Sequence, residues 1–139
     1  MSVWKAYKFA KKAHKGQFDK AGIPYINHPK YVASKLNDKD CKIVALLHDV
    51  VEDTEITLET IEEKFGKKIA DAVNAMTKRE NEDYIVYLNR VKANPIAKQV
   101  KLIDMYHNLD ITRLKCFDTE DAKRRVRKYL KGIAYLLEI

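Results

Sequence analysis

Apolar positions recur every three or four residues along most of this 139-residue chain, which is the spacing of amphipathic helices. The helices expected from this spacing cover about residues 3–15, 30–37, 39–52, 57–66, 67–76, 82–93, 95–110 and 119–137. Thr57 is placed to cap one of them, Gly66 to end it and Pro95 to open another. The sequence therefore predicts an all-α fold.

Between the first two predicted helices lies a loop, GQFDKAGIPYINHP (residues 16–29), which holds two glycines and two prolines. No stretch alternates apolar and polar residues as a strand would, and we find no repeat, linker or low-complexity tract. The length suits one domain. We therefore predict that residues 1–139 form a single helical-bundle domain.

The net charge of +7 is unevenly distributed. Residues 1–36 carry eight lysines and one acid, residues 37–63 carry nine acids and two lysines, and residues 122–132 are basic again. The basic residues are interleaved with apolar ones at helical spacing and form no block. We therefore assign them to solvated helix faces and do not expect a nucleic-acid partner.

The sequence carries no signal that we associate with membranes or export. No run of about eighteen apolar residues occurs, so no membrane span is expected, and the N-terminus lacks the apolar core and cleavage site of a signal peptide. Cys41 and Cys116 lie far apart in the chain, which fits free thiols in a reducing compartment. We expect a cytoplasmic protein, and the sequence gives no indication of its oligomeric state.

The stretch LLHDVVEDTEIT (residues 46–57) places four ionisable residues in a hydrophobic run. On one continuous helix, a sector of about 140° contains all of them, namely His48, Asp49, Glu52 and Asp53. A solvated acidic face is one interpretation, but such a face would include basic residues, and the stretch has none. Carboxylates on a largely buried helix are costly unless a cation neutralises them. The stretch therefore favours a metal site.

The His-Asp doublet supplies two different kinds of ligand. His48 offers a neutral nitrogen and Asp49 an anionic oxygen, a mixture that suits first-row transition metals better than Mg²⁺. Two adjacent residues cannot complete a coordination shell, so further ligands must come from elsewhere. Candidates are His28, in the loop, and Asp104, in another apolar helical context.

Other polar residues are then available for catalysis. Glu52 and Asp53 can orient or deprotonate a water molecule whose pKa the metal lowers. Asn108 can hydrogen-bond the water or the substrate. A site of this kind suits hydrolysis of a phosphoester or phosphoanhydride.

Six short motifs follow one another along the chain: AHKGQ, GIPYINHP, ALLHDVVEDT, FGKKIADAV, MTK, and VKLID with HNL just after it. In this order they resemble the hydrolase domain of the RelA/SpoT-type alarmone enzymes, and the stand-alone small alarmone hydrolases in particular. These are HD-type metal-dependent phosphohydrolases. The resemblance covers about residues 6–115.

The resemblance implies an all-helical HD fold that binds one Mn²⁺, or another divalent metal. The ligands that it implies are His28, His48, Asp49 and Asp104. It also implies that Glu52 and Asp53 activate the water. The expected reaction removes pyrophosphate from the 3′ position of guanosine 3′,5′-bis(diphosphate), (p)ppGpp.

The expected substrate is thus a nucleotide. The residues expected to contact it are Lys20, Tyr25, Lys101 and Asn108. The lysines would meet phosphate oxygens, and the resemblance implies that the tyrosine lines the substrate pocket.

Two positions depart from the family pattern. Asp19 stands where alarmone hydrolases usually carry an Arg that packs on guanine, and Asp110 stands where an Arg usually follows the Asn-Leu pair. Loss of a stacked guanidinium would weaken base recognition by about 1–2 kcal/mol. Three functions therefore stay open: (p)ppGpp hydrolysis, hydrolysis of a different nucleotide or phosphate ester, and binding of a nucleotide or RNA without catalysis.

Overall fold

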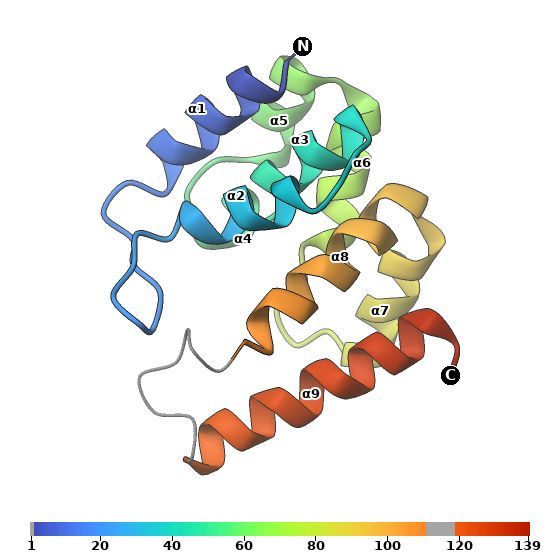
Figure 1. The fold of residues 1–139 in the computed structure, drawn as a ribbon. Helices are drawn as coiled ribbons and strands as arrows, with labels where there is room; N and C mark the ends of the chain where they lie inside the picture. The colour runs from blue at the N-terminus through green and yellow to red at the C-terminus, as the bar shows by residue number, and fades with distance from the viewer. Residues whose placement is uncertain (1, 111–118) are drawn as a thin grey trace.

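The computed structural model describes residues 2–110 and 119–139 and confirms the all-α prediction (Figure 1). Its helices are α1 (Val3–Ala13), α2 (Asn27–Ser34), α3 (Lys39–Leu47), α4 (Val50–Asp53), α5 (Leu58–Phe65), α6 (Lys67–Met76), α7 (Tyr84–Ala93), α8 (Pro95–Asn108) and α9 (Glu120–Leu137). Within the described residues, the only strand-like feature is a β-bridge between Phe18 and Pro24. No helix in this part of the chain is long and apolar enough to cross a membrane.

Helix α3 lies in the core of the molecule. Its buried residues are Cys41, Ile43, Val44, Ala45, Leu46 and Leu47. Helices α1, α2, α6 and α8 pack around it, because a helix that is apolar on nearly every side is stable only inside such a shell. Cys41 is a free thiol, as predicted, whereas Cys116 lies outside the described residues. The C-terminal end of α3 is therefore delivered to the protein interior.

Helix α9 runs along the bottom of Figure 1 and packs against α8 and α7. Gly132 allows the close approach. A Cβ atom at this position would lie 2.7 Å from the Tyr84 hydroxyl and 2.8 Å from the Met105 sulfur, which is closer than real Cβ atoms come to other heavy atoms. The glycine therefore fixes how tightly α9 packs on its neighbours.

Several helix ends form as the sequence predicts. The Thr57 hydroxyl accepts a hydrogen bond from the Thr60 N–H and caps α5. Gly66 ends α5 with φ of 90°, a conformation that L side chains rarely adopt. Pro95 opens α8 in the first turn. These boundary predictions are confirmed.

Two predicted boundaries are wrong, and both concern candidate metal ligands. The helix expected at 30–37 begins at Asn27, so His28 lies in the first turn of α2 rather than in the loop. Pro29 is compatible with this position because a first-turn proline loses no intrahelical hydrogen bond. The helix expected at 39–52 is interrupted, since α3 ends at Leu47 and α4 begins at Val50.

The segment between α1 and α2 folds back on itself in a tight turn. The Asp19 N–H donates to the Ile23 carbonyl over 2.8 Å, and the Asp19 carboxylate accepts from the N–H groups of Ala21 and Ile23 at 2.9 and 3.0 Å. Gly22 completes the turn with φ of +82°. One oxygen of the Asp19 carboxylate is therefore used to hold its own turn together.

Candidate active site

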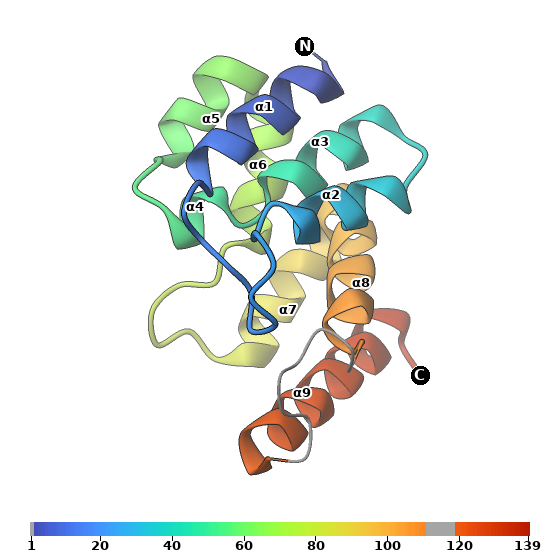
Figure 2. The same cartoon turned by 60° about the vertical axis from the view of Figure 1, so that its left-hand side comes forward.

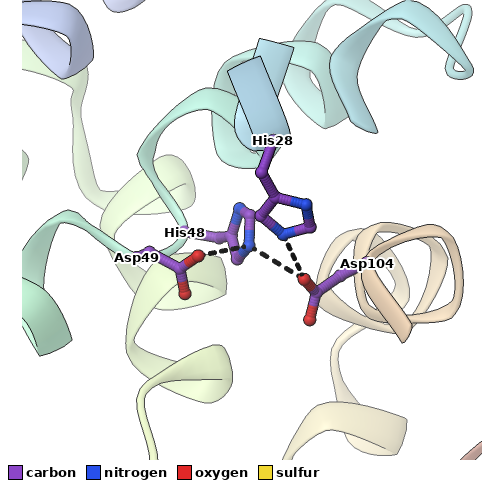
Figure 3. A group of neighbouring side chains, drawn as sticks. All are labelled: His28, His48, Asp49 and Asp104. Carbon is purple, nitrogen blue, oxygen red and sulfur yellow. Dashed lines mark hydrogen bonds and ion pairs between the residues drawn. The ribbon is translucent and has the colours of Figure 1, made fainter. Parts of the chain in front are cut away.

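The four predicted metal ligands lie together, although they come from separate parts of the fold (Figure 3). His28 lies in α2, His48 directly follows α3, Asp49 directly precedes α4 and Asp104 lies in α8. One ligand atom from each side chain lies within 4.8 Å of the other three. His28, His48 and Asp104 are each at most 4% exposed. The sequence prediction thus identified residues that the fold brings together.

The side chains of the cluster face one another at short distances. Asp104 Oδ1 lies 2.7 Å from His28 Nε2 and 3.3 Å from His48 Nε2. His48 Nε2 lies 3.0 Å from Asp49 Oδ2. In Figure 3 both imidazole rings direct their Nε2 atoms towards the carboxylates. The four donor atoms thus converge on one small volume.

The interruption between α3 and α4 explains how two neighbouring residues reach the same point. On a continuous helix, adjacent side chains diverge by about 100°. Here His48 and Asp49 form a turn between the two helices, and their ligand atoms come within 3.0 Å of each other. The break between α3 and α4 therefore lets both residues of the doublet face one ion.

The donor set fits a divalent transition metal. Metal–nitrogen and metal–oxygen bonds of about 2.1 Å place opposite ligands about 4.2 Å apart, and the four donor atoms here fall within 4.8 Å. Two imidazoles with two carboxylates are ligands that Mn, Fe and Zn accept. A set of this size also leaves room for a water molecule or a substrate oxygen on an octahedral ion.

Neighbouring groups fix the orientation of both histidines. His48 Nδ1 lies 2.5 Å from the Ala45 carbonyl and donates to it, so Nε2 is the nitrogen available to bind a metal. His28 Nδ1 lies 2.7 Å from His107 Nδ1, and the planes of the two rings differ by only 4°. Tyr31 stacks on the His107 ring with centroids 3.9 Å apart. His107 was not among the predicted site residues. Its position one turn after Asp104 was the available signal.

The two carboxylates are held in the same way. The Tyr25 hydroxyl donates to Asp49 Oδ2 over 2.5 Å, and Asn108 Nδ2 donates to Asp104 Oδ1 over 3.2 Å. Lys101 Nζ donates to Asp104 Oδ2 over 3.0 Å. Lys101 was predicted to contact substrate, and the structure places its ammonium against a candidate metal ligand.

The cluster stabilises positive charge. Burial lowers the pKa of His48, but the carboxylates of Asp49 and Asp104 outweigh burial and raise this pKa well above 6.5. Burial raises the pKa of Asp104, yet Lys101 and His48 hold it well below its ordinary value. Burial also raises the pKa of Asp49, yet His48 lowers it to about 2. Both carboxylates are therefore ionised at neutral pH, as metal ligands must be.

The pKa values of Glu52 and Asp53, in contrast, are raised. Partial burial and then the Asp49 carboxylate raise the pKa of Glu52. Partial burial, followed by the carboxylates of Asp49 and Glu52, raises the pKa of Asp53 to about 6. Both side chains remain open to solvent on one side. A carboxylate with a pKa near neutrality, beside a candidate metal site, is suited to accept a proton from water.

The AHKGQ motif supports the turn that carries these acids. Gln17 Nε2 donates to the Asp53 carbonyl over 3.0 Å, and Gln17 Oε1 lies 2.8 Å from His14 Nδ1. Burial lowers the pKa of His14, so the ring is neutral and donates through Nδ1. His14 is 2% exposed, and its ring centroid lies 5.0 Å from that of Tyr25. Gln17 thus ties α1 to the end of α4.

We expect Gln17→Ala to lower kcat about tenfold, because small displacements of a catalytic group are costly. KM and metal affinity should change little, and steady-state kinetics with a manganese titration would separate these quantities. Gln17→Glu removes the same N–H donor but keeps an oxygen near His14, and it should behave like the alanine variant. Lys15→Ala, at an exposed neighbouring position, is the control. Wild-type kcat in both Gln17 variants would contradict the role.

A pocket of about 320 Å³ opens beside the cluster. Tyr25 and Asn108 belong to its wall, and they hydrogen-bond Asp49 and Asp104 respectively. Lys20, on the same loop as Tyr25, lies 3.8 Å from Asp121 of α9. Arg125 and Tyr129 of α9 complete the wall. Three of the four predicted substrate contacts therefore line one pocket, and α9 supplies contacts that the sequence did not predict.

These features define a class of protein: an all-helical domain with a largely buried His₂Asp₂ cluster suited to a divalent metal, beside a pocket that Lys20 and Arg125 line. The profile of the HD domain family matches residues 6–128. The chain belongs to this family, and an HD domain implies a divalent metal at such a cluster.

Several named bacterial proteins are similar in sequence to this chain. The guanosine-3′,5′-bis(diphosphate) 3′-pyrophosphohydrolase of Aquifex aeolicus is 35% identical over 135 residues, which cover 91% of this chain and 19% of that protein. The bifunctional (p)ppGpp synthase/hydrolase SpoT of Escherichia coli K12 is 44% identical over 117 residues, which cover 81% of this chain and 16% of that protein. The chain thus spans less than a fifth of the length of either relative.

A solved structure of a metazoan ortholog of SpoT that hydrolyzes ppGpp shares the fold. Its TM-score is 0.81, and the match covers 97% of this chain and 84% of that chain at 24% identity. This match independently supports the all-helical architecture.

Proposed function

We propose that this domain is a Mn²⁺-dependent pyrophosphohydrolase that acts on guanosine 3′,5′-bis(diphosphate). The observation that carries the proposal is the His₂Asp₂ cluster, which is linked through Tyr25 and Asn108 to a neighbouring pocket with cationic side chains in its wall. The names of the Aquifex and Escherichia relatives support the substrate. Mixed nitrogen and oxygen ligands support manganese or another first-row ion over Mg²⁺.

A divalent ion at the cluster would polarise a phosphoryl oxygen and lower the pKa of a water molecule. His28, His48, Asp49 and Asp104 would hold it. The Tyr25 hydroxyl keeps the Asp49 carboxylate in place by donating to it. The four ligand residues thus supply a rigid base for the reaction.

The acidic residues of α4 move the proton. Asp53, with its raised pKa, accepts a proton from the attacking water, and Glu52 lies beside it in the sequence. The water oxygen bonds to the phosphorus nearest the ribose, and the bond from this phosphorus to the 3′ oxygen breaks. The products are pyrophosphate and a nucleoside 5′-diphosphate, whose 3′ oxygen takes a proton from solvent.

The pocket supplies the contacts that bind a highly anionic nucleotide. Lys20 and Arg125 line it with cationic groups, and Tyr129 offers an aromatic ring. Arg125 comes from α9, so this pocket has a guanidinium although position 19 has none. The fold therefore supplies a cation to the pocket despite the departure at Asp19.

The proposal is tested by a product assay. Purified protein with Mn²⁺ should convert guanosine 3′,5′-bis(diphosphate) into equal amounts of pyrophosphate and GDP, and EDTA should stop the reaction. A panel of other nucleotides and phosphate monoesters serves as the comparison. Turnover of panel members without any turnover of the bis(diphosphate) would keep the hydrolase class and reject this substrate.

Asp19 is the observation that favours a different phosphate compound, since its carboxylate lines the pocket. If the bis(diphosphate) is the substrate, we expect Asp19→Arg to lower its KM about fivefold, because one stacked cation contributes about 1 kcal/mol. Asp19→Asn is the matched control. It removes the charge and keeps an oxygen for the turn, so its KM should fall less.

Higher KM in both Asp19 variants would contradict this expectation. It would mean that the carboxylate contacts the true substrate. The panel would then identify a substrate with hydrogen-bond donors at that place.

Two further expectations form part of the proposal. We treat residues 1–139 as one catalytic domain, because the family profile covers most of them. A nucleotide substrate and a buried free thiol at Cys41 fit a cytoplasmic protein.

A further inference from the structure

Helix α1 carries a second hollow surface, most of which the proposed reaction does not use. One hollow of about 690 Å³ lies between α1 and the loop that follows it. Another of about 590 Å³ lies between α1, α2 and α3. Trp4, Tyr7 and Lys11 line both hollows, so the two are continuous along α1. We call this surface the α1 groove.

The charge of the α1 groove has one sign. Its charged lining residues are Lys8, Lys11, Lys12, Lys15, Lys30 and Lys42. Among the described residues, no aspartate or glutamate lines either hollow. A long surface of this kind attracts a polyanion and gains free energy from the counterions that the polyanion releases.

Exposed aromatic rings alternate with these lysines. Trp4 and Phe18 are each 63% exposed, and Trp4 stacks on Tyr7 with ring centroids 5.5 Å apart. Lys8 lies 6.0 Å from the Trp4 ring, and Lys11 lies 6.0 Å from the Tyr7 ring. Two highly exposed rings in a basic groove are placed to stack on a partner with flat apolar faces.

We propose that the α1 groove binds a single-stranded polynucleotide, which revises the expectation from sequence spacing that no nucleic acid binds, because the fold gathers the lysines on one surface. Lysines would contact successive phosphates, and Trp4 and Phe18 would stack on bases, which is the combination that sequence-tolerant single-strand binders use. An acidic peptide would satisfy the lysines but would leave the exposed rings without stacking partners. The charge and the rings together therefore favour a polynucleotide.

The α1 groove ends beside the candidate active site. Phe18 and Tyr25 line both the groove and the 320 Å³ pocket. Binding in the groove does not need the metal cluster, whose four residues lie outside both hollows. The inference can thus be tested separately from the proposed hydrolysis.

Trp4 is the only tryptophan in the chain, so its fluorescence reports on the α1 groove directly. The probe is an oligouridylate about 12 nucleotides long, a length within the usual site size, titrated into the protein in EDTA. We expect quenching of Trp4 and a Kd of about 10⁻⁶–10⁻⁴ M that weakens steeply with salt. Absence of quenching at low salt would overturn the proposal.

Charge-reversal variants assign the site. Lys11→Glu should weaken binding about tenfold, because Lys11 lines both hollows. Lys131→Glu makes the same change in net charge on α9, away from α1 (Figure 2), and should weaken binding less than about twofold. Equal losses in the two variants would mean a diffuse charge effect and would contradict the groove.

Two further measurements distinguish a polynucleotide ligand of the α1 groove from an acidic protein. Trp4→Ala, read by anisotropy of a labelled oligouridylate, should bind about tenfold more weakly, since stacking is lost while every lysine remains. Polyglutamate of matched charge should bind less tightly than the oligouridylate and should quench Trp4 little. Equal or tighter binding of polyglutamate, with no effect of Trp4→Ala, would replace the polynucleotide by an acidic protein partner.

Discussion

His48→Ala should lower kcat/KM for the proposed substrate about 10³-fold or more and should abolish the rise in Tm that Mn²⁺ gives the wild type. A metal contributes several kcal/mol of transition-state stabilisation, and each 1.36 kcal/mol is a factor of ten in rate. His48 is 2% exposed and faces both Asp49 and Asp104. Thermal denaturation with and without Mn²⁺, beside steady-state kinetics, checks both parts of the expectation.

The control for His48→Ala is Ile43→Ala, which shortens a fully buried side chain of α3, the helix that His48 directly follows. It should lower Tm by creating a cavity and should keep both the manganese response and turnover. His48→Gln is a second variant in case the alanine variant fails to fold. Wild-type turnover by a folded His48 variant would show that the ligand assignment is wrong.

Asp53→Asn should lower kcat by about 10²–10⁴-fold, the range for loss of a general base. It should retain manganese binding, because Asp53 is not one of the four clustered ligands. The amide has nearly the same shape, so the Gln17 contact to the backbone carbonyl of residue 53 is preserved. Rapid-quench kinetics at saturating substrate would measure the chemical step.

The same assignment predicts an acid limb in the pH profile. The pKa of Asp53 is raised to about 6, and a base works only when it is deprotonated. The rate should therefore fall as pH drops through about 6 and should be restored as pH rises. Glu55→Gln, an acid-to-amide change at an exposed position two residues away, should leave both kcat and the profile unchanged. An Asp53→Asn enzyme of normal rate would assign the base elsewhere.

Residue chemistry pointed to His48 and Asp49 and made His28 and Asp104 candidates, and the family resemblance completed the set of four ligands. Ionisable groups inside an apolar run require compensation, and the structure brings His28, His48, Asp49 and Asp104 to within 4.8 Å of one another. The all-helical class followed from apolar periodicity, because the apolar face of every predicted helix had to pack against a core. The roles of the four clustered residues as metal ligands stay a prediction.

The break between α3 and α4 could not be read from periodicity. Apolar residues continue on both sides of His48 and Asp49, so a helical wheel treats the stretch as one helix. The indication was chemical: two neighbouring ligands for one ion are incompatible with the 100° divergence of a continuous helix. Two neighbouring ligands for one ion therefore predict a turn at His48 and Asp49.

The pocket wall was unpredicted for a different reason. Arg125 and Tyr129 reach the site through packing of α9 on α7 and α8, and sequence spacing contains no information on that packing. Lys101 illustrates the same limit. Its residue type suggested a phosphate contact, whereas tertiary structure places it 3.0 Å from Asp104 Oδ2.

The most direct test of the account is anomalous diffraction from crystals grown with MnCl₂. We expect one manganese peak at about 2.0–2.3 Å from His28 Nε2, His48 Nε2 and carboxylate oxygens of Asp49 and Asp104. Manganese bound only elsewhere would contradict the account. Crystals without a manganese peak, from protein that still releases pyrophosphate in EDTA, would also contradict it.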